Sequence, residues 1–185
     1  MVLYIHGFAS SGEGNKARIF REHYRKMGIA YLAPSLSFIP ELAIATLEEI
    51  IKNCDDVKLI GSSLGGYYAN FLARKYDIQA VLINPSITPQ ETLKRTLGEV
   101  ECFYANGGRF CWEENHLKML EQYRITNPHL NNLLLLIQKG DETLDYREAL
   151  DYLNGAKMVI EDGGSHSFDG IARHFETIDR FLGIL

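Results

Sequence analysis

The sequence is poor in the features that mark several classes of protein. Its three cysteines, Cys54, Cys102 and Cys111, include no C-x-x-C pair, which predicts reduced thiols, although Cys102 and Cys111 could approach one another in the fold. No run of Lys or Arg forms a basic stripe and the net charge is −5, so we expect no nucleic-acid partner. No apolar run reaches the length of a membrane span, and no basic segment leads into an apolar one at the N-terminus. We therefore expect a cytoplasmic protein without membrane insertion.

The sequence also lacks the motifs of metal and nucleotide sites. There is no H-E-x-x-H and no clustered Cys/His spacing that would hold zinc. Gly7 and Gly12 have the spacing of the first and last glycines of a phosphate loop, but Glu13-Gly14 replaces the required Lys-Ser/Thr. A carboxylate at this point repels phosphate, and no G-x-G-x-x-G follows any predicted strand. We expect no metal ion and no cofactor.

What the chain does contain is an alternation of short apolar runs with helical periodicities. With 185 residues, of which 46% are hydrophobic and 23% charged, it fits one globular domain over residues 1–185. Apolar runs of strand length stand at 2–5, 30–33, 57–60, 80–83, 133–137 and 157–160. Strands that alternate with helices predict a mostly parallel sheet covered on both faces. We expect an α/β fold, a three-layer α/β/α sandwich with about six strands.

From about 86 to 131 this alternation lapses. Thr88-Pro89 predicts the start of a helix that ends at Gly98, and a second helix is expected over about 113–123. Four aromatic residues of this section stand out: Phe103, Tyr104, Phe110 and Trp112. We interpret the section as a short helical insertion that crosses the top of the sheet like a lid. Its aromatic side chains either line an apolar acyl pocket or pack the insertion onto the sheet, and both interpretations stay open.

The run at 57–60 leads directly into G-S-S-L-G, centred on Ser63, and a helical pattern follows. This is G-x-S-x-G in a strand–turn–helix context, in which the central serine occupies a sharp, strained turn. Gly61 and Gly65 leave room beside Ser63, whose hydroxyl is then lifted clear of the sheet. The backbone N–H of Leu64 lies in the first turn of the helix, where the dipole favours negative charge. The turn therefore predicts a nucleophile, Ser63, and one oxyanion donor, Leu64.

Two further reactive groups follow the ends of later strands. Asp141 follows the fifth apolar run, and His166 lies in a Gly-rich loop after the sixth. The carboxyl ends of parallel strands meet at one edge of a sheet, and the order Ser, Asp, His is that of α/β hydrolases. Histidine can take the serine proton, and a carboxylate fixes the imidazole and stabilises the imidazolium. Asp145 and Asp162 are alternative acids, but Asp145 is expected to cap the next helix and Asp162 would have to reach His166 from within one loop.

Four segments carry a resemblance to a known family: His6-Gly7-Phe8, G-S-S-L-G-G at 61–66, G-D-E-T-L-D-Y at 140–146 and G-G-S-H at 163–166. Together they resemble the α/β-hydrolase superfamily and, more narrowly, the small bacterial YqiA-type esterases. The resemblance extends from the first strand to the last helix. It implies a catalytic triad of Ser63, Asp141 and His166.

The resemblance also implies a second oxyanion donor, the backbone N–H of Phe8, paired with that of Leu64. In the same family pattern His6 shapes the oxyanion loop, although a hydrogen-bonded histidine at the end of a strand describes it equally well. The resemblance implies short acyl esters as substrates, with acyl-CoA thioesters as the alternative.

We therefore predict a serine hydrolase that cleaves small acyl esters through a covalent acyl-enzyme. Its partner is then a small-molecule acyl ester or thioester. A thioesterase and a serine peptidase are the enzymatic alternatives, because the same triad serves all acyl transfers. A non-catalytic binding module on the same scaffold is the remaining alternative. A site freed from chemistry, however, need not keep Ser63, Asp141, His166 and both glycines of the turn.

Overall fold

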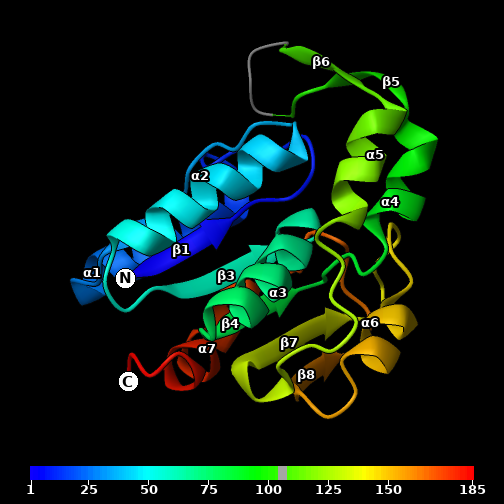
Figure 1. Cartoon of the computed structure of the whole chain (residues 1–185). Coiled ribbons are helices and arrows are strands. Elements are labelled where there is room, and N and C mark those ends of the chain that lie inside the picture. The colour runs from blue at the N-terminus through cyan, green and yellow to red at the C-terminus, as the bar shows by residue number, and fades with distance from the viewer. Residues whose placement is uncertain (104–107) are drawn as a thin grey trace.

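A computed structural model describes residues 1–103 and 108–185 of the chain (Figure 1). Six short runs pair in one sheet in the order β2-β1-β3-β4-β7-β8, and every pair is parallel. The strands are β1 (Val2–Ile5), β2 (Tyr31–Leu32), β3 (Lys58–Ser62), β4 (Ala80–Ile83), β7 (Leu133–Gln138) and β8 (Lys157–Glu161). The predicted parallel sheet is confirmed, and the carboxyl ends of its strands share one edge.

The central strands are buried on both faces of the sheet. All four residues of β1 are buried, which explains why its sequence is apolar without a polar alternation. Leu3 and Ile5 belong to the core on one face, and Val2 and Tyr4 belong to the core on the other.

Helices cover both faces. The face of Leu3 and Ile5 carries α2 (Pro40–Asn53), α3 (Leu64–Tyr76) and α6 (Tyr146–Tyr152). The opposite face carries α1 (Asn15–Met27), the 3-10 turn η3 (Ile171–His174) and α7 (Phe175–Phe181). The predicted three-layer α/β/α arrangement is therefore confirmed.

The section that interrupts the alternation is only partly helical. It contains α4 (Pro89–Thr92), the 3-10 turn η1 (Leu93–Thr96), β5 (Gly98–Glu101), β6 (Arg109–Trp112) and α5 (Glu114–Glu121), and the 3-10 turn η2 (Leu130–Asn132) leads into β7. β5 and β6 form a separate antiparallel ribbon that the sequence-based prediction lacks. Its signal is the alternation in β6, where Phe110 and Trp112 are buried between exposed neighbours. In Figure 1, α4 and α5 lie beyond the carboxyl ends of the strands, with the ribbon above them.

Within residues 1–103 and 108–185, no helix is long and apolar enough to cross a membrane. The three cysteines are free thiols, and Cys111 is exposed on β6. Nowhere in the same ranges do three or more His, Cys, Asp or Glu side chains gather as they would around a metal ion.

Candidate active site

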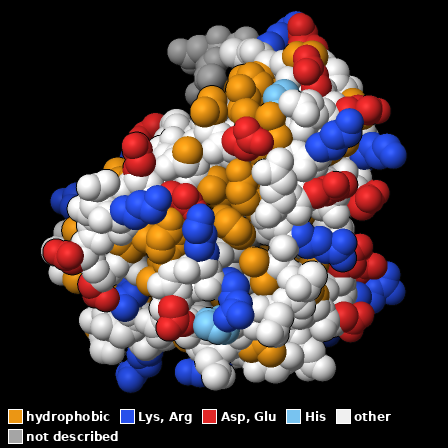
Figure 2. Space-filling view, in the orientation of Figure 1, with side chains coloured by type: hydrophobic (Ala, Val, Ile, Leu, Met, Phe, Trp, Pro, Cys, Tyr) orange, Lys and Arg blue, Asp and Glu red, His pale blue; other side chains and the backbone are white. Residues whose placement is uncertain are grey.

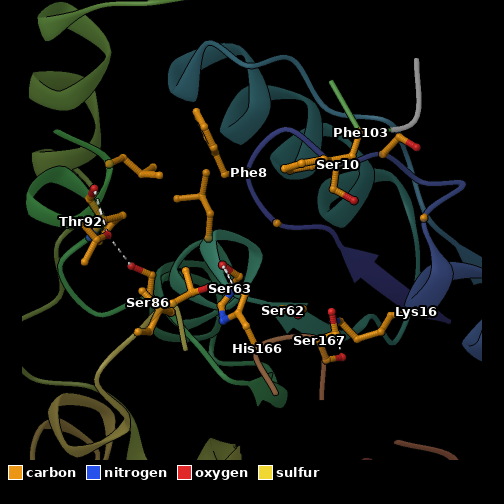
Figure 3. Close-up of a pocket in the computed structure, with 18 of the residues that line it drawn as sticks. Phe8, Ser10, Lys16, Ser62, Ser63, Ser86, Thr92, Phe103, His166 and Ser167 are labelled. Atoms are coloured by element: carbon orange, nitrogen blue, oxygen red, sulfur yellow. Dashed lines mark hydrogen bonds between the residues drawn. The ribbon is translucent and has the colours of Figure 1, made fainter. Parts of the chain in front are cut away.

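Ser63, Asp141 and His166 come together beyond the carboxyl ends of β3, β7 and β8. The Nε2 atom of His166 lies 3.0 Å from Ser63 Oγ, as the dashed line in Figure 3 marks, and its Nδ1 atom lies 2.7 Å from Asp141 Oδ2. The loops after β7 and β8 stay hydrogen-bonded beyond the ends of these strands, because the N–H of Gly140 donates to the carbonyl of Gly163 over 2.8 Å. One continuous hydrogen-bonded relay therefore links hydroxyl, imidazole and carboxylate.

The backbone at Ser63 is strained and tightly held. Its φ is 57° and its ψ is −122°, a conformation that residues with a side chain rarely adopt. The turn is fixed from both sides: the Ser63 N–H donates to the Ile83 carbonyl, and the Ser63 carbonyl accepts from the amides of Gly66, Tyr67 and Ser86. A Cβ atom on Gly65 would lie 2.0 Å from the carbonyl oxygen of Ile5, so only glycine fits there. These contacts hold the hydroxyl at the edge of the sheet.

Both carboxylate oxygens of Asp141 are occupied. Oδ1 accepts from the backbone N–H groups of Thr143 and Leu144, each over 2.8 Å, and Oδ2 faces His166. The side chain is only 2% exposed, and this burial raises the pKa of Asp141. The hydrogen bonds from His166, Leu144 and Thr143 outweigh burial, so the net pKa lies below its ordinary value. Asp141 is thus an ionised hydrogen-bond acceptor that faces the imidazole.

The alternative acids have other partners. Asp145 begins α6, where its Oδ1 accepts from the N–H of Arg147 and its carboxylate pairs with the Arg147 guanidinium. Asp162 pairs with Lys139 over 2.7 Å and is almost fully exposed. Geometry therefore assigns the contact with His166 to Asp141.

Three residues that support the His166 loop are missing from the sequence-based prediction. Asn84 and Gln138 are buried polar residues at the ends of β4 and β7, and both carboxamides hydrogen-bond the loop. Glu142 accepts from the backbone N–H of His166 over 3.0 Å. In the sequence, the only indication of Asn84 and Gln138 is that each is a polar residue at the end of an apolar run. The same pattern is typical of an ordinary strand end.

The loop of Gly7 and Phe8 comes close to Ser63, and Leu64 follows Ser63 directly in the chain. In the described ranges neither the N–H of Phe8 nor that of Leu64 has a hydrogen-bond acceptor. The loop comes close because residue 7 is glycine: a Cβ atom on Gly7 would lie 3.2 Å from Ser63 Cβ. The arrangement can present two N–H donors to an oxygen next to Ser63 Oγ.

His6 fixes the loop that carries Phe8. Its Nε2 accepts from the N–H of Leu36 over 2.9 Å, so Nδ1 carries the proton and donates to the carbonyl of Gly7 over 2.8 Å. Burial lowers the pKa of His6, because water is removed from the imidazolium form. His6 is therefore a neutral histidine that ties this loop to the segment after β2.

A cavity of about 350 Å³ opens at Ser63 and His166 (Figure 3). Phe8, Leu64, Leu93 and Phe103 give it apolar walls. A second, smaller cavity of about 90 Å³ shares Phe8 and Leu64 with the first. The larger cavity thus has an apolar wall next to the hydroxyl of Ser63 and a size for a small ligand.

The aromatic residues predicted for an acyl pocket divide among different places. Phe103 lines the larger cavity and is 76% exposed, while Phe110 lines the smaller one. Trp112 is 1% exposed and lines neither; its ring packs edge-on against Phe8 with the centroids 4.8 Å apart. Tyr104 lies outside the described residues. In Figure 2, hydrophobic side chains form a band that runs from the ribbon end of the molecule down between α2 and α5.

Known structures with this fold identify its class. Mouse alpha/beta hydrolase domain-containing protein 10 superposes with a TM-score of 0.75 at 18% identity, covering 99% of this chain and 89% of the mouse chain. Est1E from Butyrivibrio proteoclasticus gives a TM-score of 0.71 at 17% identity, with 99% and 85% covered. The chain thus has the α/β-hydrolase fold, as the sequence predicts.

The family follows from the sequence. Residues 1–183 match the family described as "Uncharacterised protein family (UPF0227)", so the chain belongs to the UPF0227 family. The UPF0227 protein of Citrobacter koseri is 27% identical over 187 residues, which cover 98% of each chain. The UPF0227 protein YcfP of Salmonella arizonae is 26% identical over the same length and coverage.

Proposed function

We propose that this chain is a serine hydrolase that cleaves small carboxylic esters, with Ser63 as nucleophile, His166 as base and Asp141 as orienting acid. The observation that carries the proposal is the unbroken relay from Ser63 Oγ through both nitrogens of His166 to Asp141. A serine hydroxyl attacks only when a base removes its proton, and the relay supplies that base in a fixed tautomer.

In the first half of the reaction, Ser63 Oγ attacks the ester carbonyl carbon while its proton passes to His166 Nε2. The carbonyl oxygen becomes an oxyanion, which the N–H groups of Phe8 and Leu64 stabilise. Collapse of this intermediate breaks the carbon–oxygen bond to the alcohol. The alcohol takes the proton from Nε2 and departs, leaving an acyl ester on Ser63.

Water completes the cycle. His166 Nε2 takes a proton from a water molecule as its oxygen attacks the acyl carbonyl carbon. The bond to Ser63 Oγ then breaks, Oγ regains a proton from Nε2, and a carboxylic acid leaves. Throughout both halves Asp141 stays ionised and stabilises the imidazolium, in keeping with its lowered pKa.

The test pairs chemical labelling with turnover. A fluorophosphonate probe should modify Ser63, located by peptide mass spectrometry, and 4-nitrophenyl acetate should be hydrolysed. Ser63→Ala should abolish labelling and lower kcat on the order of 10⁵- to 10⁶-fold. Thr46→Ala removes a hydroxyl from the exposed side of α2 and should change neither. Unchanged hydrolysis by folded Ser63→Ala would refute the proposal.

The leaving group is a separate question, since the same relay serves thioesters and peptide bonds. Matched acetyl substrates with an oxygen ester, a thioester and an anilide separate the three. We expect the oxygen ester to give the highest kcat/KM.

A further inference from the structure

The charges around the larger cavity are all of one sign. Lys16 from the first turn of α1 and Arg95 from η1 both line it. Among the lining residues that the structure describes, none is Asp or Glu. Asp141 lies behind His166 and is used by the relay. The two cations therefore face the cavity without a carboxylate on the cavity's own surface to offset them.

Lys16 is the better placed of the two cations. Its Nζ donates to the carbonyl of Ser167 over 2.8 Å, and no carboxylate in the described part of the chain forms an ion pair with it. Partial burial lowers the pKa of Lys16 to about 8, and the more distant charges of Asp141 and Asp169 offset this only in part. The amine still keeps its proton near neutral pH, in a place where an added anion would stabilise it.

Arg95 contacts the loop that carries Asp141. Its guanidinium donates to the carbonyl of Thr143 over 3.2 Å, and Thr143 belongs to the turn that holds Asp141. Lys16 contacts the residue directly after His166. Both cations are thus attached to the loops that position His166, and Figure 3 shows Lys16 and Ser167 together on the side of the cavity away from Phe8.

This placement distinguishes the two halves of an ester. His166 Nε2 delivers a proton to the departing alcohol, so the alcohol half must lie beside His166. The acyl half then faces the apolar wall of Phe8, Leu64 and Phe103.

We propose that the cavity selects esters whose alcohol half carries an anionic group, a carboxylate or a phosphate, and that Lys16 is the residue that determines this specificity, with Arg95 at its rim. The inference rests on the proposed hydrolase function. It adds the class of substrate and a residue outside the relay.

A matched pair of substrates tests it. 4-Acetoxybenzoate releases an alcohol half with a carboxylate, and methyl 4-acetoxybenzoate releases the same half without the charge. The quantity to measure is the ratio of kcat/KM for the charged ester to that for the neutral ester. A charge-assisted contact predicts that Lys16→Met lowers this ratio about 10- to 100-fold, because the cation contacts only the charged group.

Three further variants make the result specific. Lys16→Arg keeps the charge and should retain most of the ratio. Lys26→Met removes an exposed lysine of the same helix, paired with Glu22, and should leave the ratio at its wild-type value. Arg95→Gln should lower it less than Lys16→Met, since Arg95 is exposed. Melting temperatures of all variants identify any that fail to fold.

Binding without turnover separates this inference from the proposed function. In Ser63→Ala, the dissociation constant measured by calorimetry should be lower for 4-acetoxybenzoate than for its methyl ester. Adding Lys16→Met should remove this difference. Equal loss of kcat/KM for both esters in Lys16→Met, or no preference in the wild type, would overturn the inference while ester hydrolysis itself stands. 4-Acetoxyphenyl phosphate serves as a second charged ester: preference for it over 4-acetoxybenzoate assigns the anion as phosphate, and the reverse assigns it as carboxylate.

Discussion

The side-chain oxygen of Asn84 accepts a hydrogen bond of 3.0 Å from the backbone N–H of Gln138. This contact joins the ends of two neighbouring strands, and both side chains then reach on to the loop of His166. Asn84 Nδ2 donates to the carbonyls of Ser165 and His166, while Gln138 Oε1 accepts from the amides of Ser165 and Asp169. The two residues are 2% and 1% exposed. Two buried carboxamides therefore hold the imidazole of His166 over the hydroxyl of Ser63.

Replacing one of these carboxamides should loosen His166. Gln138→Met keeps the volume but leaves the partly buried N–H groups of Ser165 and Asp169 without their acceptor, which costs on the order of 1 kcal/mol of unfolding free energy for each group. We expect kcat for a neutral acetyl ester to fall roughly 10- to 100-fold with a smaller change in KM, because a misplaced base acts mainly on the chemical step.

The matched control is Gln79→Met, whose Nε2 donates to the carbonyl of Phe181 far from the relay. It should lower the unfolding free energy without changing kcat. If Gln138→Met unfolds more easily yet labels with fluorophosphonate at the wild-type rate, Gln138 stabilises the fold and does not position His166.

Asp141→Asn should preserve the geometry of the site but lower the rate of ester hydrolysis. An amide cannot stabilise the imidazolium, and the NH₂ group favours the wrong tautomer of His166. We expect kcat to fall on the order of 10³- to 10⁴-fold, with little change in KM. Asp145→Asn, which alters the cap of α6, should change thermal stability slightly and leave kcat in place. A larger loss in Asp145→Asn than in Asp141→Asn would reverse the assignment of the acid.

Local patterns account for much of the fold and for the order of the reactive groups. The strand–turn–helix context around Ser63 predicts the strained turn, and the apolar runs predict the strands at whose ends Asp141 and His166 stand. These features depend on neighbours in sequence, which is why a pattern can reveal them. The confirmed sheet then places strand ends along one edge without further information.

Contacts between segments that are distant in the chain cannot be predicted from local sequence patterns. The partners of Asn84 lie more than fifty residues along the chain, so nothing near it distinguishes a loop anchor from a strand breaker. Lys16 and Arg95 meet the same cavity from α1 and η1, and a single lysine in a helix carries no local signal for that. The β5–β6 ribbon consists of two four-residue strands, too short for periodicity to be decisive.

Stability should depend on pH through His6. Burial lowers the pKa of His6 below its ordinary value of 6.5, so the unfolded chain binds a proton that the folded chain refuses. The stability of the wild type is therefore fully present above that value and falls as pH drops below it. His6→Gln lacks this group, so its unfolding free energy should decline less between about pH 7.5 and about pH 5.5. Urea unfolding of both proteins across this range checks the sign, and parallel curves would contradict it.

Variants of Phe103 and Trp112 should distinguish an aromatic side chain that lines an acyl pocket from one that packs the insertion onto the sheet. Phe103 is exposed on the cavity wall, so Phe103→Ala should leave unfolding free energy nearly unchanged and shift preference among acetyl, butyryl and hexanoyl esters. Trp112 is buried against Phe8, so Trp112→Ala should cost about 3–5 kcal/mol of unfolding free energy. Because Phe8 also supplies a proposed oxyanion donor, Trp112→Ala should lower kcat for all three esters by a similar factor. A chain-length shift in Trp112→Ala, and none in Phe103→Ala, would show that the acyl chain lies on the Trp112 side of Phe8.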